Sequence, residues 1–240
     1  MKHFKFIPTL LLAVTILLVT SCKKEETQEI TIERGTVTDI DGNTYQTVKI
    51  GDQWWMAENL RVSRFNDGTP LLLIGLTDPD SVWANAGEAA YTYINDSIFG
   101  NLYNGEVITS EKNIAPAGWH VPSDAEWQKM ERTIGMDEAD IAGAGWRGMN
   151  EGEKITSKYS QGWPEGGELF GTDEYGFNAL PGGCRLHDGR TNIFNNTSFW
   201  WTNDFTEDEG WYRYIDKNDK RIFRQHTYRQ YGMSIRCIKD

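Results

Sequence analysis

The residue types that most often carry out chemistry in proteins form no catalytic or metal-binding motif in this sequence. The four histidines, His3, His120, His187 and His226, are far apart, and neither His-Glu-x-x-His nor Cys-x-x-Cys occurs. No Gly-x-Ser-x-Gly elbow is present. Segment 143–148 (GAGWRG) fits Gly-x-Gly-x-x-Gly, but no βαβ unit surrounds it, so turn glycines explain it better. The sequence therefore predicts a protein that is not an enzyme.

Two adjacent side chains offer oxygen ligands for a metal ion. Asn203 and Asp204 follow a pair of tryptophans in segment 200–204 (WWTND). Amide and carboxylate oxygens suit Ca²⁺, so a calcium site is one interpretation of this segment. The alternative is that both side chains cap a loop, as Asn and Asp often do. No other cofactor is expected.

The elements that must position these residues are short. Ser123 and Glu126 form a capping box that predicts a helix through about Thr133, and a weaker helix is expected over 137–142. Alternating apolar residues and turn signals predict a hairpin of 36–40 with 44–50, a strand at 53–58, a turn at 188–189, a hairpin of 211–215 with 221–226, and a strand at 233–238. The predicted fold class is α+β, with antiparallel hairpins, one or two short helices, and loops rich in Gly and Trp.

The N-terminus has the pattern of an exported lipoprotein. Two lysines precede the apolar run 10–20, which is too short to span a bilayer. Small residues then lead to Cys22, as in a lipobox. We expect residues 1–21 to be a signal peptide and Cys22 to become the acylated first residue. The alternative is an ordinary signal peptide with an incidental cysteine.

The rest of the chain is expected to be a tether and one domain. Residues 22–35 are polar and charged and predict a flexible tether, followed by a domain over 36–240. The whole chain has 24 basic and 35 acidic residues, and residues 1–21 contain two lysines and no acidic residue, so the mature chain carries a net charge of −13. An acidic surface argues against nucleic acid as a partner. The expected partner at the N-terminus is membrane lipid, through acylated Cys22.

Ordered sequence blocks resemble a known family. The blocks are 41–45 (DGNTY), 53–60 (QWWMAENL), 118–127 (GWHVPSDAEW), 145–148 (GWRG), 175–183 (YGFNALPGG), 200–202 (WWT) and 231–239 (YGMSIRCIK). Together they resemble the Fibrobacter succinogenes major paralogous domain, found in exported proteins of Bacteroidetes and relatives, over about 36–240. The Val-Pro-Ser-x-x-Glu-Trp and Arg-Cys blocks also resemble the formylglycine-generating-enzyme group, which implies a C-type-lectin-like fold.

The resemblance separates two groups of aromatic residues. The chain contains ten Trp, ten Tyr and ten Phe, and those in the family blocks are expected in the core. Trp83, Trp163 and Trp211 lie outside the strongest blocks, so we expect them, with Tyr212, to be exposed ligand contacts. C-type lectins often place Trp-Asn-Asp at a calcium and sugar site, but here Thr202 interrupts that triplet.

The resemblance also bears on the cysteines. Outside the cytoplasm two thiols more often pair than not, so Cys184 and Cys237 are expected to form a disulfide. In the family a cysteine often stands where this chain has Ala115, and Cys184 is expected to replace that partner of Cys237. The alternative is two buried thiols that pack as small hydrophobic side chains.

These observations favour a membrane-anchored binding module outside the cytoplasm, for a glycan or another envelope component. One alternative is a structural component of an envelope or adhesin assembly. A second is a formylglycine-generating-like enzyme, whose cysteine pair is missing. Lys23 in place of Asp argues against inner-membrane retention, and Lys-Lys-Glu-Glu at 23–26 resembles the export tag of Bacteroidetes surface lipoproteins. We therefore expect an outer-membrane lipoprotein, and the sequence leaves open whether it lies on the outer face of that membrane.

Overall fold

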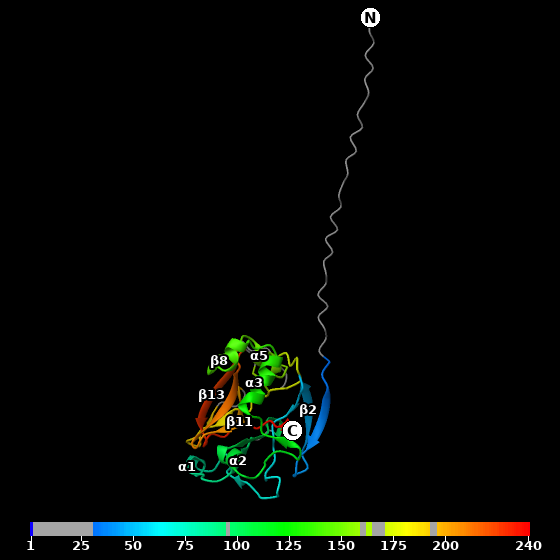
Figure 1. The fold of residues 1–240 in the computed structure, drawn as a ribbon. Coiled ribbons are helices and arrows are strands. Elements are labelled where there is room, and N and C mark those ends of the chain that lie inside the picture. The colour runs from blue at the N-terminus through cyan, green and yellow to red at the C-terminus, as the bar shows by residue number, and fades with distance from the viewer. Residues whose placement is uncertain (2–30, 95–96, 159–161, 165–170, 193–195) are drawn as a thin grey trace.

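The computed structural model describes Met1 and residues 31–94, 97–158, 162–164, 171–192 and 196–240 (Figure 1). The expected signal peptide and Cys22 lie outside these residues, so their processing stays a prediction. No helix among the described residues is long and apolar enough to cross a membrane. The described elements are mostly strands with five short α-helices, which confirms the mixed fold class and the antiparallel hairpins, although more helices form than expected.

A five-stranded sheet contains the N-terminal hairpin. Its order is β1 (Arg34–Thr38), β2 (Thr44–Ile50), β3 (Gln53–Met56), β14 (Ile238–Lys239) and β7 (Trp119–His120), all antiparallel. The carboxylate of Asp39 accepts hydrogen bonds from the backbone N–H of Asp41 (3.0 Å) and Asn43 (2.9 Å), and Gly42 has φ +83°. This local turn chemistry confirms the predicted first hairpin.

A second, four-stranded antiparallel sheet has the order β11 (Thr197–Phe205), β12 (Glu209–Asp216), β13 (Ile222–Tyr228) and β8 (Gly145–Arg147). The predicted hairpin of 211–215 with 221–226 is therefore confirmed. Smaller sheets pair β9 (Cys184–Arg185) with β10 (Thr191–Asn192), and β4 (Leu72–Leu73) with β5 (Ala90–Tyr93) and β6 (Asn101–Tyr103). In the predicted last strand, Met233 and Ser234 form only isolated bridges.

The longest helix is α3 (Asp124–Thr133), which begins at the predicted capping box. The Ser123 hydroxyl accepts from the backbone N–H of Glu126, and the Glu126 carboxylate accepts from the backbone N–H of Ser123. The weaker predicted helix forms as α4 (Glu138–Ile141). Two further helices and a 3₁₀ turn were not predicted: α2 (Gly105–Thr109), α5 (Glu151–Ile155) and the turn Ser97–Phe99. The short helix α1 (Asp80–Ala84) forms within 61–90, where the sequence pattern allows one short helix among loops.

The core between α3 and the two large sheets is aromatic. Trp127 packs against Trp55 (centroids 5.0 Å apart), Phe177 (5.8 Å) and Trp200 (5.9 Å), and all four side chains are buried. These residues come from α3, β3, β11 and the segment 171–183, so the cluster joins parts of the chain that are distant in sequence. The expectation that tryptophans in the family blocks form the core holds for these residues.

The predicted disulfide between Cys184 and Cys237 does not form in the structure, where both residues are described, and this prediction was wrong. Cys237 is a free, fully buried thiol in the hydrophobic cluster of Tyr45 and Met56. Cys184 lies in a different cluster, with Trp201 and Met233. Burial raises the pKa of the Cys237 thiol. The alternative of buried cysteines that pack as small hydrophobic side chains describes this arrangement better.

His120 joins the last residue of the chain to α3, and this contact predicts a pH dependence. Its ring nitrogens lie 2.7 Å from Asp240 Oδ1 and 2.9 Å from Glu126 Oε1. Burial lowers the pKa of His120, but the two carboxylates outweigh burial and raise it. Because the folded-state pKa exceeds the unfolded value of about 6.5, protonated His120 stabilises the fold below that pH, and the contribution is lost as pH rises through the folded-state pKa.

We therefore expect His120→Asn to destabilise the protein more at pH 5.5 than at pH 9. Urea denaturation of both proteins at the two pH values measures the difference. An equal loss of unfolding free energy at the two pH values would contradict the assignment.

Candidate functional site: an aromatic face of the four-stranded sheet

Two of the predicted exposed tryptophans are buried, which corrects the expectation for them. Trp83 donates from Nε1 to the backbone oxygen of Gln230 (2.7 Å), and the guanidinium of Arg185 lies 4.7 Å from its ring centroid. Trp163 donates from Nε1 to the backbone oxygen of Ala179 (3.0 Å). Both rings are at most 7% exposed. Their position outside the family blocks therefore did not predict exposure, since each indole N–H has a carbonyl partner inside the fold.

The other two candidates, Trp211 and Tyr212, are half-buried neighbours on β12 and point to opposite faces of the sheet. The Arg224 guanidinium lies 3.8 Å from the Trp211 ring centroid, and the His226 ring lies 5.1 Å from it. One face of Trp211 is thus already covered by a cation. Tyr212 belongs to the opposite face, where further aromatic side chains gather.

That opposite face carries a row of aromatic side chains that crosses all four strands. In the register of the sheet, Phe199 lies opposite Tyr214, Tyr214 opposite Phe223, and Phe223 opposite Trp146. Ring centroids along the row are 4.5, 5.7 and 5.2 Å apart. All four side chains are half-buried, so each ring keeps contact with solvent. We call these four residues, with the adjacent Tyr212, the aromatic face.

Polar groups border the aromatic face. The Tyr214 hydroxyl donates to Asp216 Oδ2 at 2.5 Å, and Asp216 Oδ1 accepts from the backbone N–H of Asn218 at 2.8 Å. At the other end, the guanidinium of Arg221 lies 5.6 Å from the Trp146 ring centroid. Burial raises the pKa of Tyr212 to about 12, so its hydroxyl stays protonated at neutral pH. The face therefore combines flat rings with hydrogen-bonding groups along its rim.

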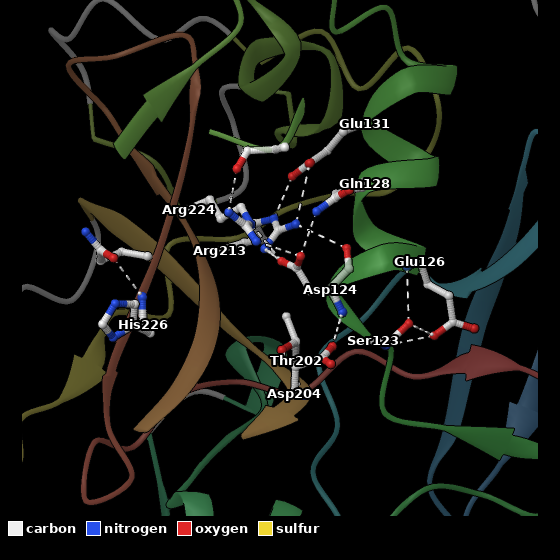
Figure 2. Close-up of polar contacts among 12 residues, drawn as sticks. Ser123, Asp124, Glu126, Gln128, Glu131, Thr202, Asp204, Arg213, Arg224 and His226 are labelled. Atoms are coloured by element: carbon white, nitrogen blue, oxygen red, sulfur yellow. Dashed lines mark hydrogen bonds and ion pairs between the residues drawn. The ribbon is translucent and has the colours of Figure 1, made fainter. Parts of the chain in front are cut away.

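Ion pairs on the inner face of the same sheet attach it to α3 (Figure 2). Glu131 accepts from Arg213 Nε (2.6 Å) and Arg147 Nη2 (2.8 Å), and Asp124 pairs with Arg213 Nη1 (2.7 Å) and Arg224 Nη2 (2.8 Å). Burial favours a higher pKa for Asp124, but Arg224 and Arg213 outweigh it and lower the pKa to about 2. These contacts connect α3 to β8, β12 and β13, so we infer that the aromatic face is a rigid platform.

Asn203 and Asp204, the predicted calcium ligands, belong to β11 and lie beside the N-terminus of α3. Asp204 Oδ2 accepts from the backbone N–H of Asp124 at 2.5 Å, and the backbone N–H of Asn203 donates to the backbone oxygen of Pro122. Figure 2 shows Asp204 beneath the N-terminus of the helix. Among the residues that the structure describes, no group of three or more His, Cys, Asp or Glu could hold a metal ion. The contact of Asp204 with Asp124 is of the capping type that was the alternative to calcium.

Four of the five residues of the aromatic face, Trp146, Phe199, Tyr214 and Phe223, were not predicted as ligand contacts. Tyr212 and Tyr214 are two residues apart on one strand, which indicates that both side chains lie on the same face of the sheet. Phe223 lies opposite Tyr214 on the paired strand and so belongs to that face as well. Only the register between strands shows that these rings form one row.

Comparisons with known proteins identify one family. Residues 48–239 match the family model of the Fibrobacter succinogenes major domain. No curated protein and no solved structure matches the chain.

Proposed function

The chain belongs to the Fibrobacter succinogenes major domain family, and from this premise we propose that it is a lipid-anchored module that binds carbohydrate on its aromatic face. The observation that carries the proposal is the row of Phe199, Tyr214, Phe223 and Trp146 across four strands. A sugar presents an apolar C–H face and a rim of hydroxyls. Half-exposed rings bordered by hydrogen-bonding groups are complementary to both.

The dimensions of the row favour a glycan chain over a single sugar. Neighbouring strands lie about 4.8 Å apart, so three spacings give a row of about 14 Å. Phe199 and Tyr214 stack on each other, and Phe223 meets Tyr214 and Trp146 edge to face, so successive sugar units would contact ring edges and ring faces in turn. Asp216 and the Tyr214 hydroxyl are placed to bond sugar hydroxyls. Because ion pairs hold the sheet to α3, little ordering entropy is lost when a ligand binds.

Two other functions from the sequence are less well supported. A structural component of an assembly would bury the aromatic face against a partner protein, and the polar rim of Asp216 and the Tyr214 hydroxyl suits sugar hydroxyls better than an apolar protein surface. A formylglycine-generating-like enzyme needs a reactive thiol, and burial raises the pKa of Cys237, which disfavours the reactive thiolate. We also propose the C-type-lectin-like fold and the outer-membrane location on the sequence resemblances alone.

A glycan array tests the proposal directly. The full-length lipoprotein in detergent micelles is applied with 2 mM Ca²⁺ or with a chelator, at a concentration on the order of 1 μM. We expect binding to extended neutral glycans, and loss of that binding in Phe223→Ala. If no glycan of any class binds, or if Phe223→Ala binds like the wild type, carbohydrate binding at this face is wrong. The chelator arm separately tests the calcium prediction for Asn203 and Asp204.

A further inference from the structure

A cavity on the side of the five-stranded sheet carries a second inference. Its volume is about 780 Å³, within the range of small-molecule sites. The polar lining comes from Arg34, Gln46 and Glu58 of the sheet region and from Asp173 and Asn178 of the segment 171–180. Phe99 and Leu180 add an apolar wall. No residue of the aromatic face lines this cavity.

Hydrogen bonds within the protein hold the wall formed by segment 171–180 in place. Asp173 (φ +44°) and Asn178 (φ +55°) are the non-glycine residues with positive φ among the described residues, a conformation that other contacts must hold in place. The backbone N–H of Asn178 donates to Asp173 Oδ1 at 2.7 Å. Behind them, the fully buried Arg236 donates to the backbone oxygens of Phe177 and Asn178. The wall is therefore preorganised before any ligand binds.

Two opposite charges, Arg34 and Asp173, line this cavity without a direct ion pair between them. Glu58 is paired with Arg61 at 3.0 Å. In the part of the chain that the structure describes, by contrast, neither Arg34 nor Asp173 forms an ion pair within 4 Å. Burial raises the pKa of Asp173 despite the more distant cations Arg236, Arg34 and Lys158. The carboxylate therefore lies in the field of these cations, with no direct ion-pair partner among the described residues.

We propose that the cavity binds a zwitterionic ligand of the amino-acid or short-peptide class, with its carboxylate on Arg34 and its ammonium on Asp173. A ligand that carries both charges can pair with Arg34 and Asp173 at once, whereas a simple anion or a simple cation pairs with only one of them and a neutral sugar with neither. Because Arg34 is exposed, its pairing adds specificity more than affinity. A zwitterion satisfies both, and Phe99 and Leu180 receive an apolar side chain. The cavity is large enough for two or three residues.

Calorimetric titration of the full-length lipoprotein in detergent with leucyl-leucine tests this inference. N-acetyl-leucyl-leucine lacks the ammonium and leucyl-leucinamide lacks the carboxylate. We expect each of them to bind at least about tenfold more weakly than leucyl-leucine, a difference of about 1.4 kcal/mol. Equal binding of the three ligands, no binding of leucyl-leucine, or tighter binding of the acidic sugar glucuronate would overturn the proposal. These outcomes do not depend on whether a glycan binds the aromatic face.

Matched variants assign the charges to residues. Asp173→Asn keeps the oxygen that accepts from Asn178 and tolerates positive φ, so the wall is preserved. In Asp173→Asn, leucyl-leucine and N-acetyl-leucyl-leucine should bind equally weakly, because the partner of the ammonium is gone. In Arg34→Gln, leucyl-leucine and leucyl-leucinamide should bind equally weakly, because the partner of the carboxylate is gone. Asp188→Asn and Arg190→Gln, which break an exposed pair outside the cavity, should bind like the wild type. Unchanged ligand preference in Asp173→Asn, with an unchanged melting temperature, would remove Asp173 from the site.

Discussion

Glu131→Gln is expected to destabilise the domain by about 3–5 kcal/mol, the range for removal of one partner from a buried ion pair. The Glu131 side chain is fully buried and bonds to both Arg147 and Arg213, whose side chains are at most 2% exposed. A neutral amide of the same shape leaves Arg147 without an acidic partner among the described residues, and it leaves Arg213 only Asp124, which Arg213 shares with Arg224. The uncompensated charge, rather than a cavity, causes the loss.

Chemical denaturation of the wild type and the variant measures this effect. The matched control is Glu138→Gln, because Glu138 pairs with Arg132 in a similar geometry, but its side chain is 75% exposed. Exposed pairs contribute about 0–1 kcal/mol, so this control should change the unfolding free energy little. A loss below about 1 kcal/mol for both variants would show that α3 does not depend on the buried network.

Tyr214→Ala is expected to weaken glycan binding about 30-fold, since Tyr214 lies at the centre of the aromatic face and contacts rings on both sides. Loss of a central aromatic contact costs about 2 kcal/mol or more in a binding site, which corresponds to this factor. Titration with the best glycan from the array gives the dissociation constants. Tyr214→Phe keeps the ring and removes the bond to Asp216, so it should weaken binding by a smaller factor.

Tyr228→Ala is the matched control for this prediction. Tyr228 is an exposed tyrosine on the neighbouring strand β13, and it alternates to the face opposite Phe223. It should leave the dissociation constant unchanged. If Tyr214→Ala and Tyr228→Ala lose affinity equally, the aromatic face is not the binding surface. The same holds if Tyr214→Ala keeps full affinity with an unchanged circular dichroism spectrum.

Features set by neighbouring residues could be predicted from the sequence. The first hairpin depends on Asp39 and Gly42 within its own turn, and α3 begins at a capping box whose two partners are three residues apart. The alternation along 211–215 predicted a strand, which forms as β12. The family blocks placed Trp55, Trp127 and Trp200 in the core for a similar reason, since large aromatic rings in ordered blocks are most often packed.

Features that need distant partners were mispredicted or missed. Trp83 and Trp163 looked like exposed contacts, but their indole N–H groups meet carbonyls of Gln230 and Ala179. Cys184 and Cys237 looked like a pair, but β9 and the segment before β14 place them in separate hydrophobic clusters. In each case the deciding neighbour is brought in by the fold, and no local pattern in the sequence identifies it.

The sequence by itself determined the family, the acidic character and the local elements, because each of these depends on composition or on residues close together in the chain, and it predicts a lipid anchor for the same reason. Only the tertiary structure decided where function can lie. The aromatic face exists because β8, from residues 145–147, pairs with β13 and adds Trp146 to rings on three later strands. The cavity proposed to bind a zwitterion exists because segment 171–180 folds over the five-stranded sheet that holds Arg34. Strand register and long-range packing determine both sites, and these are properties of the whole chain.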